Sequence, residues 1–176
     1  MNRKGDVLLV DGYNIIGAWP VLNRLRDRDL EDARDALLDM LADYQGFTGM
    51  LVYVVFDAHQ VPGLGAKFKQ HKLMVVYTRE KETADECIER LVSELTIRGR
   101  DIYVATSDMT EQHVAFGKGA LRISARELLI DVEQKRKLIQ ATLREVEAKP
   151  SKRNTLDGTL SLDVRAKFER MRRGEV

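Results

Sequence analysis

Four aspartates stand where side chains of an α/β protein could do chemistry. Asp11, Asp57 and Asp108 each follow a short apolar run, and Asp85 falls where a helix begins after another such run. The carboxyl ends of neighbouring parallel strands meet at one edge of an open sheet, and the sites of α/β proteins lie outside that edge. We therefore expect the four carboxylates to gather there.

A cluster of carboxylates predicts a hard divalent cation. Acids that lie close together raise one another's pKa, so the cluster needs a compensating positive charge. Oxygen ligands suit Mg²⁺ or Mn²⁺, whereas catalytic zinc sites usually include histidine. Such a cation activates water for attack on phosphorus, so the pattern favours metal-assisted phosphate chemistry. A plainer interpretation stays open for each aspartate, as a turn residue, a helix N-cap or a partner of a helix dipole.

The elements that must position these residues alternate between apolar runs and helical periodicity. Such runs are typical of buried parallel strands. Strands are predicted at 7–10, 51–56, 74–77, 102–105 and 121–123. Apolar stripes predict helices around 33–41 and 84–95, and a long helix is expected from 124 to about 146. The spacings Thr83/Glu86 and Ser124/Glu127 are capping boxes for the last two helices. Right-handed connections then give an open, mainly parallel sheet of about five strands flanked by helices.

The composition describes a soluble globular protein. The chain has 176 residues, of which 44% are hydrophobic and 32% charged. A single cysteine, Cys87, excludes an internal disulfide. No N-terminal apolar run is long enough for a signal sequence or a membrane span, so a cytoplasmic protein without a membrane partner is expected. Trp19, beside Pro20, could stack on a base, but we favour a loop anchor.

The charge is uneven along the chain. From Glu133 onward lie 12 of the 29 basic residues but only 7 of the 28 acidic ones. A basic tail on an acidic body fits an arm that binds a polyanion, although composition alone favours a merely solvated terminal helix. We expect a domain at 1–148 and a basic C-terminal extension with a short helix at 149–176.

Five segments of the chain resemble, in order, the motifs of a known family. They are Asp11–Gly17, Val55–His59, Glu82–Glu86, Ala105–Asp108 and Phe116–Leu128. The first resembles the opening motif of NYN nuclease domains, which are relatives of the PIN domain. Together they resemble the YacP-like family of bacterial ribosome-associated endoribonucleases. The resemblance covers about Asp6 to Glu147, and the residues after Lys149 match none of its motifs.

This resemblance implies a three-layer, PIN-like fold and cleavage of RNA by metal-activated water. The reaction we expect leaves 5′-phosphate and 3′-hydroxyl ends. Asp11, Asp85 and Asp108 would bind Mg²⁺ or Mn²⁺ and would be catalytic, with Asp57 as a supporting or additional metal ligand. Asn14 would be a fourth catalytic residue, which orients water or a ligand through its amide. Ser107 would help to fix the Asp108 loop. A turn role for Asn14 stays open.

Five basic residues are candidates for contact with RNA. Lys67, Lys69 and Lys72 are expected in a loop between the second and third predicted strands, beside the acidic edge. Arg122 and Arg126 flank the helix start at 124, whose N–H groups could hold a phosphate. A solvated surface is an equal alternative for these five residues.

The expected function is metal-dependent cleavage of mRNA on translating ribosomes, and hence a part in mRNA decay. Two other functions stay open. One is a non-catalytic module that binds RNA or the ribosome. The other is a metal-dependent phosphatase that acts on small phosphorylated molecules.

Overall fold

A computed structural model of the protein describes residues 5–58, 67–70, 72–97, 99–107 and 119–148. The chain divides into two compact units, Met1–Gln140 and Ala141–Val176. The sheet and the helices packed on it lie in the first unit. Among the described residues no helix is long and apolar enough to cross a membrane.

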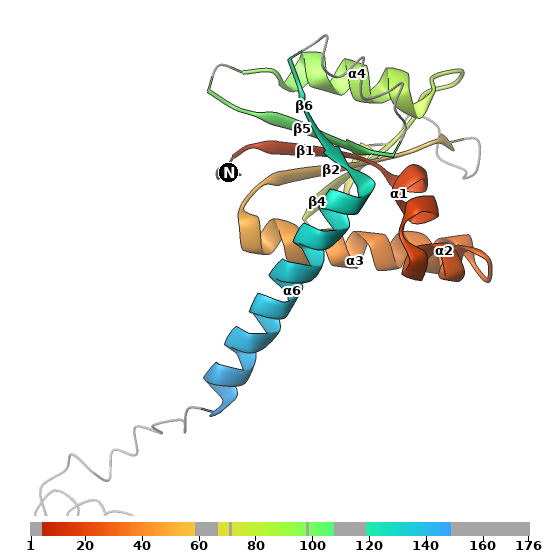
Figure 1. Cartoon of the computed structure of the whole chain (residues 1–176). Helices are drawn as coiled ribbons and strands as arrows, with labels where there is room; N and C mark the ends of the chain where they lie inside the picture. The colour runs from red at the N-terminus through yellow and green to blue at the C-terminus, as the bar shows by residue number, and fades with distance from the viewer. Residues whose placement is uncertain (1–4, 59–66, 71, 98, 108–118, 149–176) are drawn as a thin grey trace, which may run out of the picture. The chain divides into compact units, whose positions relative to one another are not determined.

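One six-stranded sheet forms the centre of the first unit, in the order β3-β4-β2-β1-β5-β6 (Figure 1). Five of the strands are parallel, as expected: β1 (Val7–Asp11), β2 (Leu51–Phe56), β4 (Leu73–Tyr77), β5 (Ile102–Thr106) and β6 (Leu121–Ser124). Strand β1 is central, between β2 and β5, and all of its residues are buried. A strand covered on both faces needs the continuous apolar run that predicted it.

Strand β3 (Lys67–Gln70) corrects one prediction, because Lys67 and Lys69 were assigned to a loop. The strand is antiparallel to β4, with Lys67 opposite Val76 and Lys69 opposite Met74. Phe68 is its only strongly apolar residue, so the alternation that signals a strand was too weak to detect. A short edge strand that carries lysines is a common protection against pairing with other chains.

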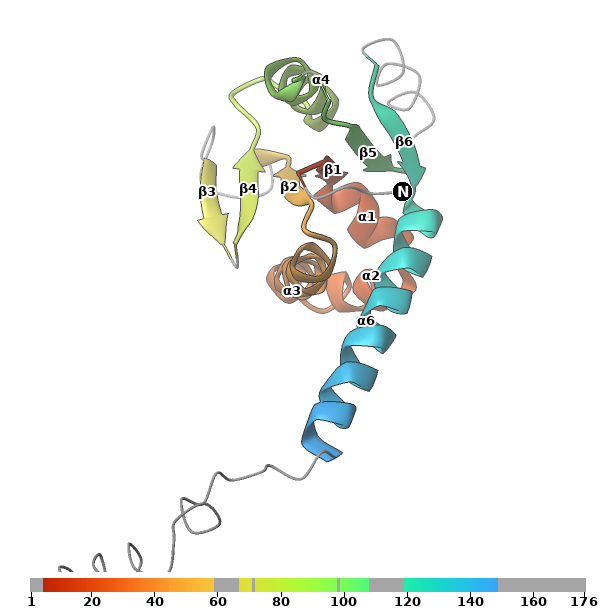
Figure 2. The ribbon, with the colours of Figure 1, turned by 90° about the vertical axis from the view of Figure 1, so that its left-hand side faces the viewer.

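Helices cover both faces of the sheet. On one face lies α4 (Ala84–Leu95); on the other lie α1 (Gly12–Ala18), α2 (Pro20–Arg26), α3 (Leu30–Thr48) and the start of α6 (Ala125–Ala148) (Figure 2). The residues of β1 alternate between these two layers. Leu8 and Val10 pack with α1 and α3, whereas Val7 and Leu9 pack with α4. The structure is therefore the expected three-layer arrangement.

Local capping signals fixed the starts of two helices. Thr83 and Glu86 form the predicted capping box of α4, with each side chain bonded to the other's backbone N–H. Ser124 and Glu127 make the same reciprocal bonds before α6. The short helices α1 and α2 were not predicted separately. They lie between β1 and α3 and decide where the residues after Asp11 point.

Candidate active site

Asp11 is the last residue of the central strand and the N-cap of α1. Its Oδ1 atom accepts a hydrogen bond from the Asn14 N–H at 3.1 Å, and the residue is only 7% exposed. Asp11 therefore does act as a helix cap, as the plainer interpretation expects. It does not exclude metal binding, because a carboxylate has about four acceptor positions.

Gly12 lets the chain pass directly from β1 into α1. A Cβ atom at this position would overlap the ring of Phe56, the last residue of β2. The backbone of α1 therefore lies against this ring, which only glycine allows. This close approach sets the position of Asn14 in the first turn of α1.

Asn14 joins the ends of β1 and β5. Its Oδ1 atom accepts hydrogen bonds from both the backbone N–H and the Oγ–H of Ser107, each at 2.7 Å. Ser107 directly follows β5 and precedes Asp108, which lies outside the described residues. Asn14 has no positive φ and sits inside a helix, so the alternative of a left-handed turn residue does not apply. Among the described residues, its Nδ2 amide makes no hydrogen bond.

Asp57 follows β2 and is half-buried beside an aromatic group. The ring centroids of Tyr13 and Phe56 are 5.1 Å apart, and those of Phe56 and Tyr77 are 5.9 Å apart. Burial raises the pKa of Tyr13; the nearby Arg34 opposes this, and the charges of Tyr77 and Asp57 add to it. Tyr13 is therefore a neutral phenol near Asp57. Sequence reasoning missed this group, although Tyr13 lies inside the first motif.

Asp85 lies in the first turn of α4, on the edge where β4 ends. Helix α4 runs back across the sheet from that edge before β5 begins (Figure 1). The approach to α4 is held by Glu82, which accepts hydrogen bonds at 2.8 Å from Arg90 Nε and from the Arg79 N–H. Asp11, Asp57 and Asp85 thus lie at one edge of the sheet, and their gathering with Asp108 stays a prediction.

Within the described part of the chain, no three acids, histidines or cysteines are grouped closely enough to hold a metal ion. Asp108, which would complete the predicted set, is outside it.

The lysines predicted to bind RNA are spread along β3 and its turn. Lys67 pairs with Val76, near the end of β4, and so lies toward the acidic edge. Lys72 immediately precedes β4, and its carbonyl accepts a hydrogen bond at 2.9 Å from Gln45 Nε2. Because β4 runs parallel to β1, Lys72 lies at the opposite edge of the sheet from Asp11. The expectation that Lys72 lies beside the acids is therefore wrong.

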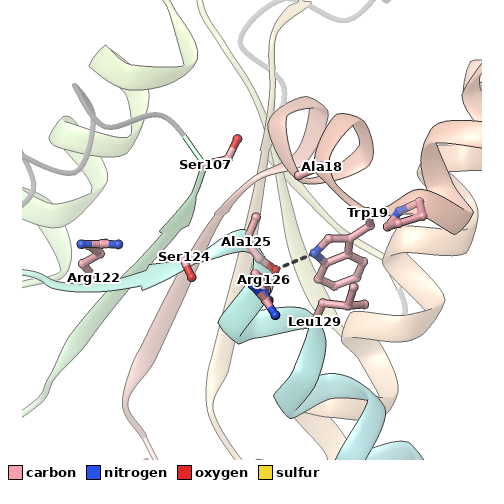
Figure 3. Close-up of a pocket in the computed structure, with 9 residues that line it drawn as sticks. Ala18, Trp19, Ser107, Arg122, Ser124, Ala125, Arg126 and Leu129 are labelled. Carbon is pink, nitrogen blue, oxygen red and sulfur yellow. Dashed lines mark hydrogen bonds between the residues drawn. The ribbon is translucent and has the colours of Figure 1, made fainter.

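A cavity of about 500 Å³ adjoins Ser107 (Figure 3). Its apolar wall includes Ala18, Pro20 and Leu129, and its charged residues are Arg122 and Arg126. Sequence reasoning had singled out the two arginines but not the apolar wall, because Leu129 has only the helical periodicity of a core residue.

Trp19 holds this region together. Its Nε1–H donates a hydrogen bond at 2.8 Å to the carbonyl of Ala125, and the side chain is 1% exposed. The predicted role of Trp19 as an anchor is confirmed, and an open stacking face is excluded. The indole joins the α1–α2 junction to the start of α6.

The start of α6 is capped by the chain's own carboxylate. Glu127 Oε2 accepts from the Ser124 N–H at 2.8 Å and from its Oγ–H at 2.6 Å. These hydrogen bonds, with help from the charge of Arg122, lower the pKa of Glu127 despite its slight burial. A phosphate bound here would therefore rely on Arg122 and Arg126 more than on the helix start itself.

Comparison with known proteins places this architecture in a family. The sequence model of the YacP-like NYN domain matches residues 8–173. The chain belongs to the YacP-like NYN family. The match extends beyond Glu147, where the resemblance of the motifs ends, so the C-terminal residues also follow the family pattern.

Relatives of this family include the uncharacterized protein YacP of Bacillus subtilis (strain 168). It is 49% identical over 172 residues, which cover 97% of this chain and 99% of that protein. The crystal structure of Rae1 (YacP) from Bacillus subtilis matches with a TM-score of 0.74 and 48% identity, over 97% of this chain and 96% of that one. A mutant of the same protein matches with a TM-score of 0.73 and 49% identity, over 82% and 84%. Membership of this NYN family is consistent with a nuclease-type function related to RNA.

Proposed function

We propose that the protein is a divalent-metal-dependent endoribonuclease that hydrolyses phosphodiester bonds in RNA. The observation that carries this proposal is the bond between Asn14 and Ser107, at 2.7 Å, in a chain of the YacP-like NYN family. It ties the first turn after Asp11 to the residue before Asp108. Asp11 and the residue that precedes Asp108 are thus held at the same edge of the sheet.

The oxygen ligands predicted at this edge suit Mg²⁺ or Mn²⁺, because they are carboxylate oxygens. Asp11, Asp85 and Asp108 would hold the ion, with Asp57 as a supporting or additional ligand. When bound, such an ion activates water and neutralises charge on the phosphoryl oxygens.

The protein's own residues would position the substrate. The Nδ2 amide of Asn14 makes no hydrogen bond to any described residue, so it could donate to a phosphate oxygen or to water. Arg122, Arg126 and Lys67 would neutralise the phosphates of the strand on either side of the acids. Holding the phosphodiester and the water together would supply much of the rate.

For the substrate, we propose mRNA on translating ribosomes, so that cleavage in the cytoplasm would lead to mRNA decay. This part of the proposal rests on the family resemblance. Its test is to map the RNA ends produced during translation with the wild-type protein and with Asp11→Asn. Ends that appear only with the wild type, and only on translated RNA, are expected. Equal cleavage of untranslated RNA would contradict the ribosomal part alone.

The reaction itself is tested with purified protein and labelled single-stranded RNA in Mg²⁺, Mn²⁺ or EDTA. Internal cleavage that needs the metal and leaves 5′-phosphate and 3′-hydroxyl ends is expected. Asp43→Asn is the matched control, because Asp43 is exposed near the end of α3, which leads into the opposite edge of the sheet, where β2 begins. RNA binding without cleavage would favour a non-catalytic module. Turnover of p-nitrophenyl phosphate with intact RNA would favour a phosphatase.

A further inference from the structure

The cavity beside Ser107 has the size and walls of a binding site. Its volume of about 500 Å³ falls within the range of roughly 300–1,000 Å³ that small-molecule sites occupy. Ala18, Pro20 and Leu129 make it apolar on one side, and Arg122 and Arg126 add two positive charges. Figure 3 shows Arg122 and Arg126 on either side of Ser124.

The cavity is built from parts that the fold holds in place. Its walls come from the α1–α2 junction, the residue after β5, and the β6–α6 junction. The buried hydrogen bond from Trp19 Nε1 to the Ala125 carbonyl, 2.8 Å long, joins the first of these parts to the third. A cavity whose walls are tied together before a ligand arrives loses less entropy on binding.

One wall of the cavity belongs to the candidate active site. Ser107 lines the cavity, and the same residue donates both of its hydrogen bonds to Asn14 Oδ1 at 2.7 Å. A ligand in the cavity would therefore lie beside the segment that leads from β5 to Asp108. An RNA strand held at the acids would therefore extend toward this cavity.

The chemistry of the walls favours a base over a lone phosphate. Glu127 already accepts the Ser124 N–H and Oγ–H, so the start of α6 carries a carboxylate of its own. An apolar surface beside guanidinium groups suits a flat, aromatic group attached to a phosphate chain. Unpaired RNA bases are recognised in part by stacking on the planes of arginine guanidinium groups, and the apolar wall would bury the other face of the base.

We propose that this cavity binds one unpaired base of an RNA strand, next to the phosphodiester held at the acidic edge. Arg122 and Arg126 would bind the phosphates that flank this base. The proposal rests on the proposed function for the identity of the strand, but it concerns binding and can be tested without cleavage.

The test measures binding of fluorescein-labelled single-stranded RNA in EDTA by fluorescence anisotropy. A second probe is an oligomer of the same length whose sugars carry no bases. Ala18→Leu fills the cavity from an exposed position, so the fold should be retained. Arg126→Ala removes one charge from the cavity, and Arg136→Ala removes the same charge from an exposed position later in α6.

The wild type should bind the base-bearing RNA more tightly than the baseless oligomer. Ala18→Leu should reduce this preference by about tenfold, which corresponds to about 1.4 kcal/mol, and leave the baseless oligomer unaffected. Arg126→Ala should weaken both probes, and Arg136→Ala should weaken neither by as much. Equal binding of the two probes by the wild type would overturn the proposal, as would an unchanged preference in folded Ala18→Leu.

The two proposals fail in different ways. A protein that shows the base preference in EDTA but cleaves no RNA in Mg²⁺ or Mn²⁺ would contradict the nuclease function only. A protein that cleaves RNA but has no preference for bases would contradict the base site only. The melting temperature of Ala18→Leu, compared with the wild type, shows whether the variant is folded.

Discussion

The side-chain oxygen of Asn14 accepts two hydrogen bonds from Ser107, a residue 93 positions away in the sequence. Asn14 stands in the first turn after the central strand, and Ser107 directly follows the neighbouring strand. The pair therefore fixes the relative position of the two strand ends that carry Asp11 and lead to Asp108. We therefore expect substitution of Asn14 to affect RNA cleavage and stability more than substitution of Ser107.

Asn14→Ala removes both hydrogen bonds, whereas Ser107→Ala keeps the bond from the backbone N–H. We expect Asn14→Ala to lower RNA cleavage by at least about tenfold and the free energy of unfolding by about 1 kcal/mol. Ser107→Ala should have a smaller effect on both. The double variant should resemble Asn14→Ala alone, because the two residues share one interaction. Single-turnover cleavage and urea unfolding measure these effects, and additive losses would count against the coupling.

Two substitutions of Asp11 separate its charge from its capping role. Asparagine caps a helix about as well as aspartate, so Asp11→Asn should keep the bond to the Asn14 N–H. Its cleavage should fall by orders of magnitude, with a melting temperature equal to that of the wild type or above it. Asp11→Ala should lose cleavage and also about 1 kcal/mol of stability. Wild-type cleavage by Asp11→Asn would reject Asp11 as a site residue.

Divalent metal should stabilise the folded protein. An ion that binds the native acids and not the unfolded chain adds about 2.7 kcal/mol at a hundred times its Kd, which raises the melting temperature by several degrees. Mg²⁺ or Mn²⁺ should produce this shift relative to EDTA in the wild type and in the Asp43→Asn control. Asp11→Asn and Asp85→Asn should lose most of it. Identical melting curves with EDTA and with Mn²⁺ would argue against a metal site.

Trp19→Phe should destabilise the protein without adding any charge. It removes the indole N–H that donates to the Ala125 carbonyl, and a hydrogen bond of this kind contributes about 0.5–1.5 kcal/mol. Urea unfolding followed by circular dichroism measures the change. Val21→Ala is the control, because Val21 is 63% exposed on the adjacent helix, so its effect should stay within about 0.5 kcal/mol. Equal stability of the two variants would contradict the role of Trp19 as an anchor.

The bond between Glu82 and Arg90 should make stability depend on acid pH. Burial by itself raises the pKa of Glu82, but hydrogen bonds from Arg90 and from the Arg79 N–H outweigh it and lower the pKa. A group with a lowered pKa stabilises the fold above its unfolded pKa, about 4.3 for glutamate. This contribution is lost as the pH falls through the lower, folded value.

Glu82→Gln should therefore be less stable than the wild type at neutral pH, by about 1–3 kcal/mol, because the bonds to a charged acceptor are replaced by neutral ones. The difference should shrink as the pH falls below about 4, where the wild-type carboxylate becomes protonated. Urea unfolding at a series of pH values measures it. A difference that is constant across this range would mean that the charge of Glu82 does not contribute.

The sequence by itself determined those features that depend on near neighbours. A continuous apolar run predicts a strand that is buried on both faces. The first such run ends just before Asp11, so the sequence places Asp11 at the end of a buried strand. Capping boxes connect residues three positions apart, so Thr83 with Glu86 and Ser124 with Glu127 marked helix starts correctly. The order of strands and helices then restricts the fold, because crossovers between parallel strands are right-handed and short.

Only the tertiary structure decided which distant residues meet. The bond between Asn14 and Ser107 depends on β1 and β5 being neighbours, which follows from how the helices cover the sheet and not from any local pattern. Likewise, β3 pairs antiparallel with β4, so the turn that contains Lys72 lies at the edge of the sheet opposite the acids. This pairing depends on hydrogen bonds between two strands and not on the sequence of either strand alone. The cavity beside Ser107 combines three separate junctions of the chain. Backbone pairing and burial act between segments far apart in sequence, so spacing along the chain does not encode their meeting points.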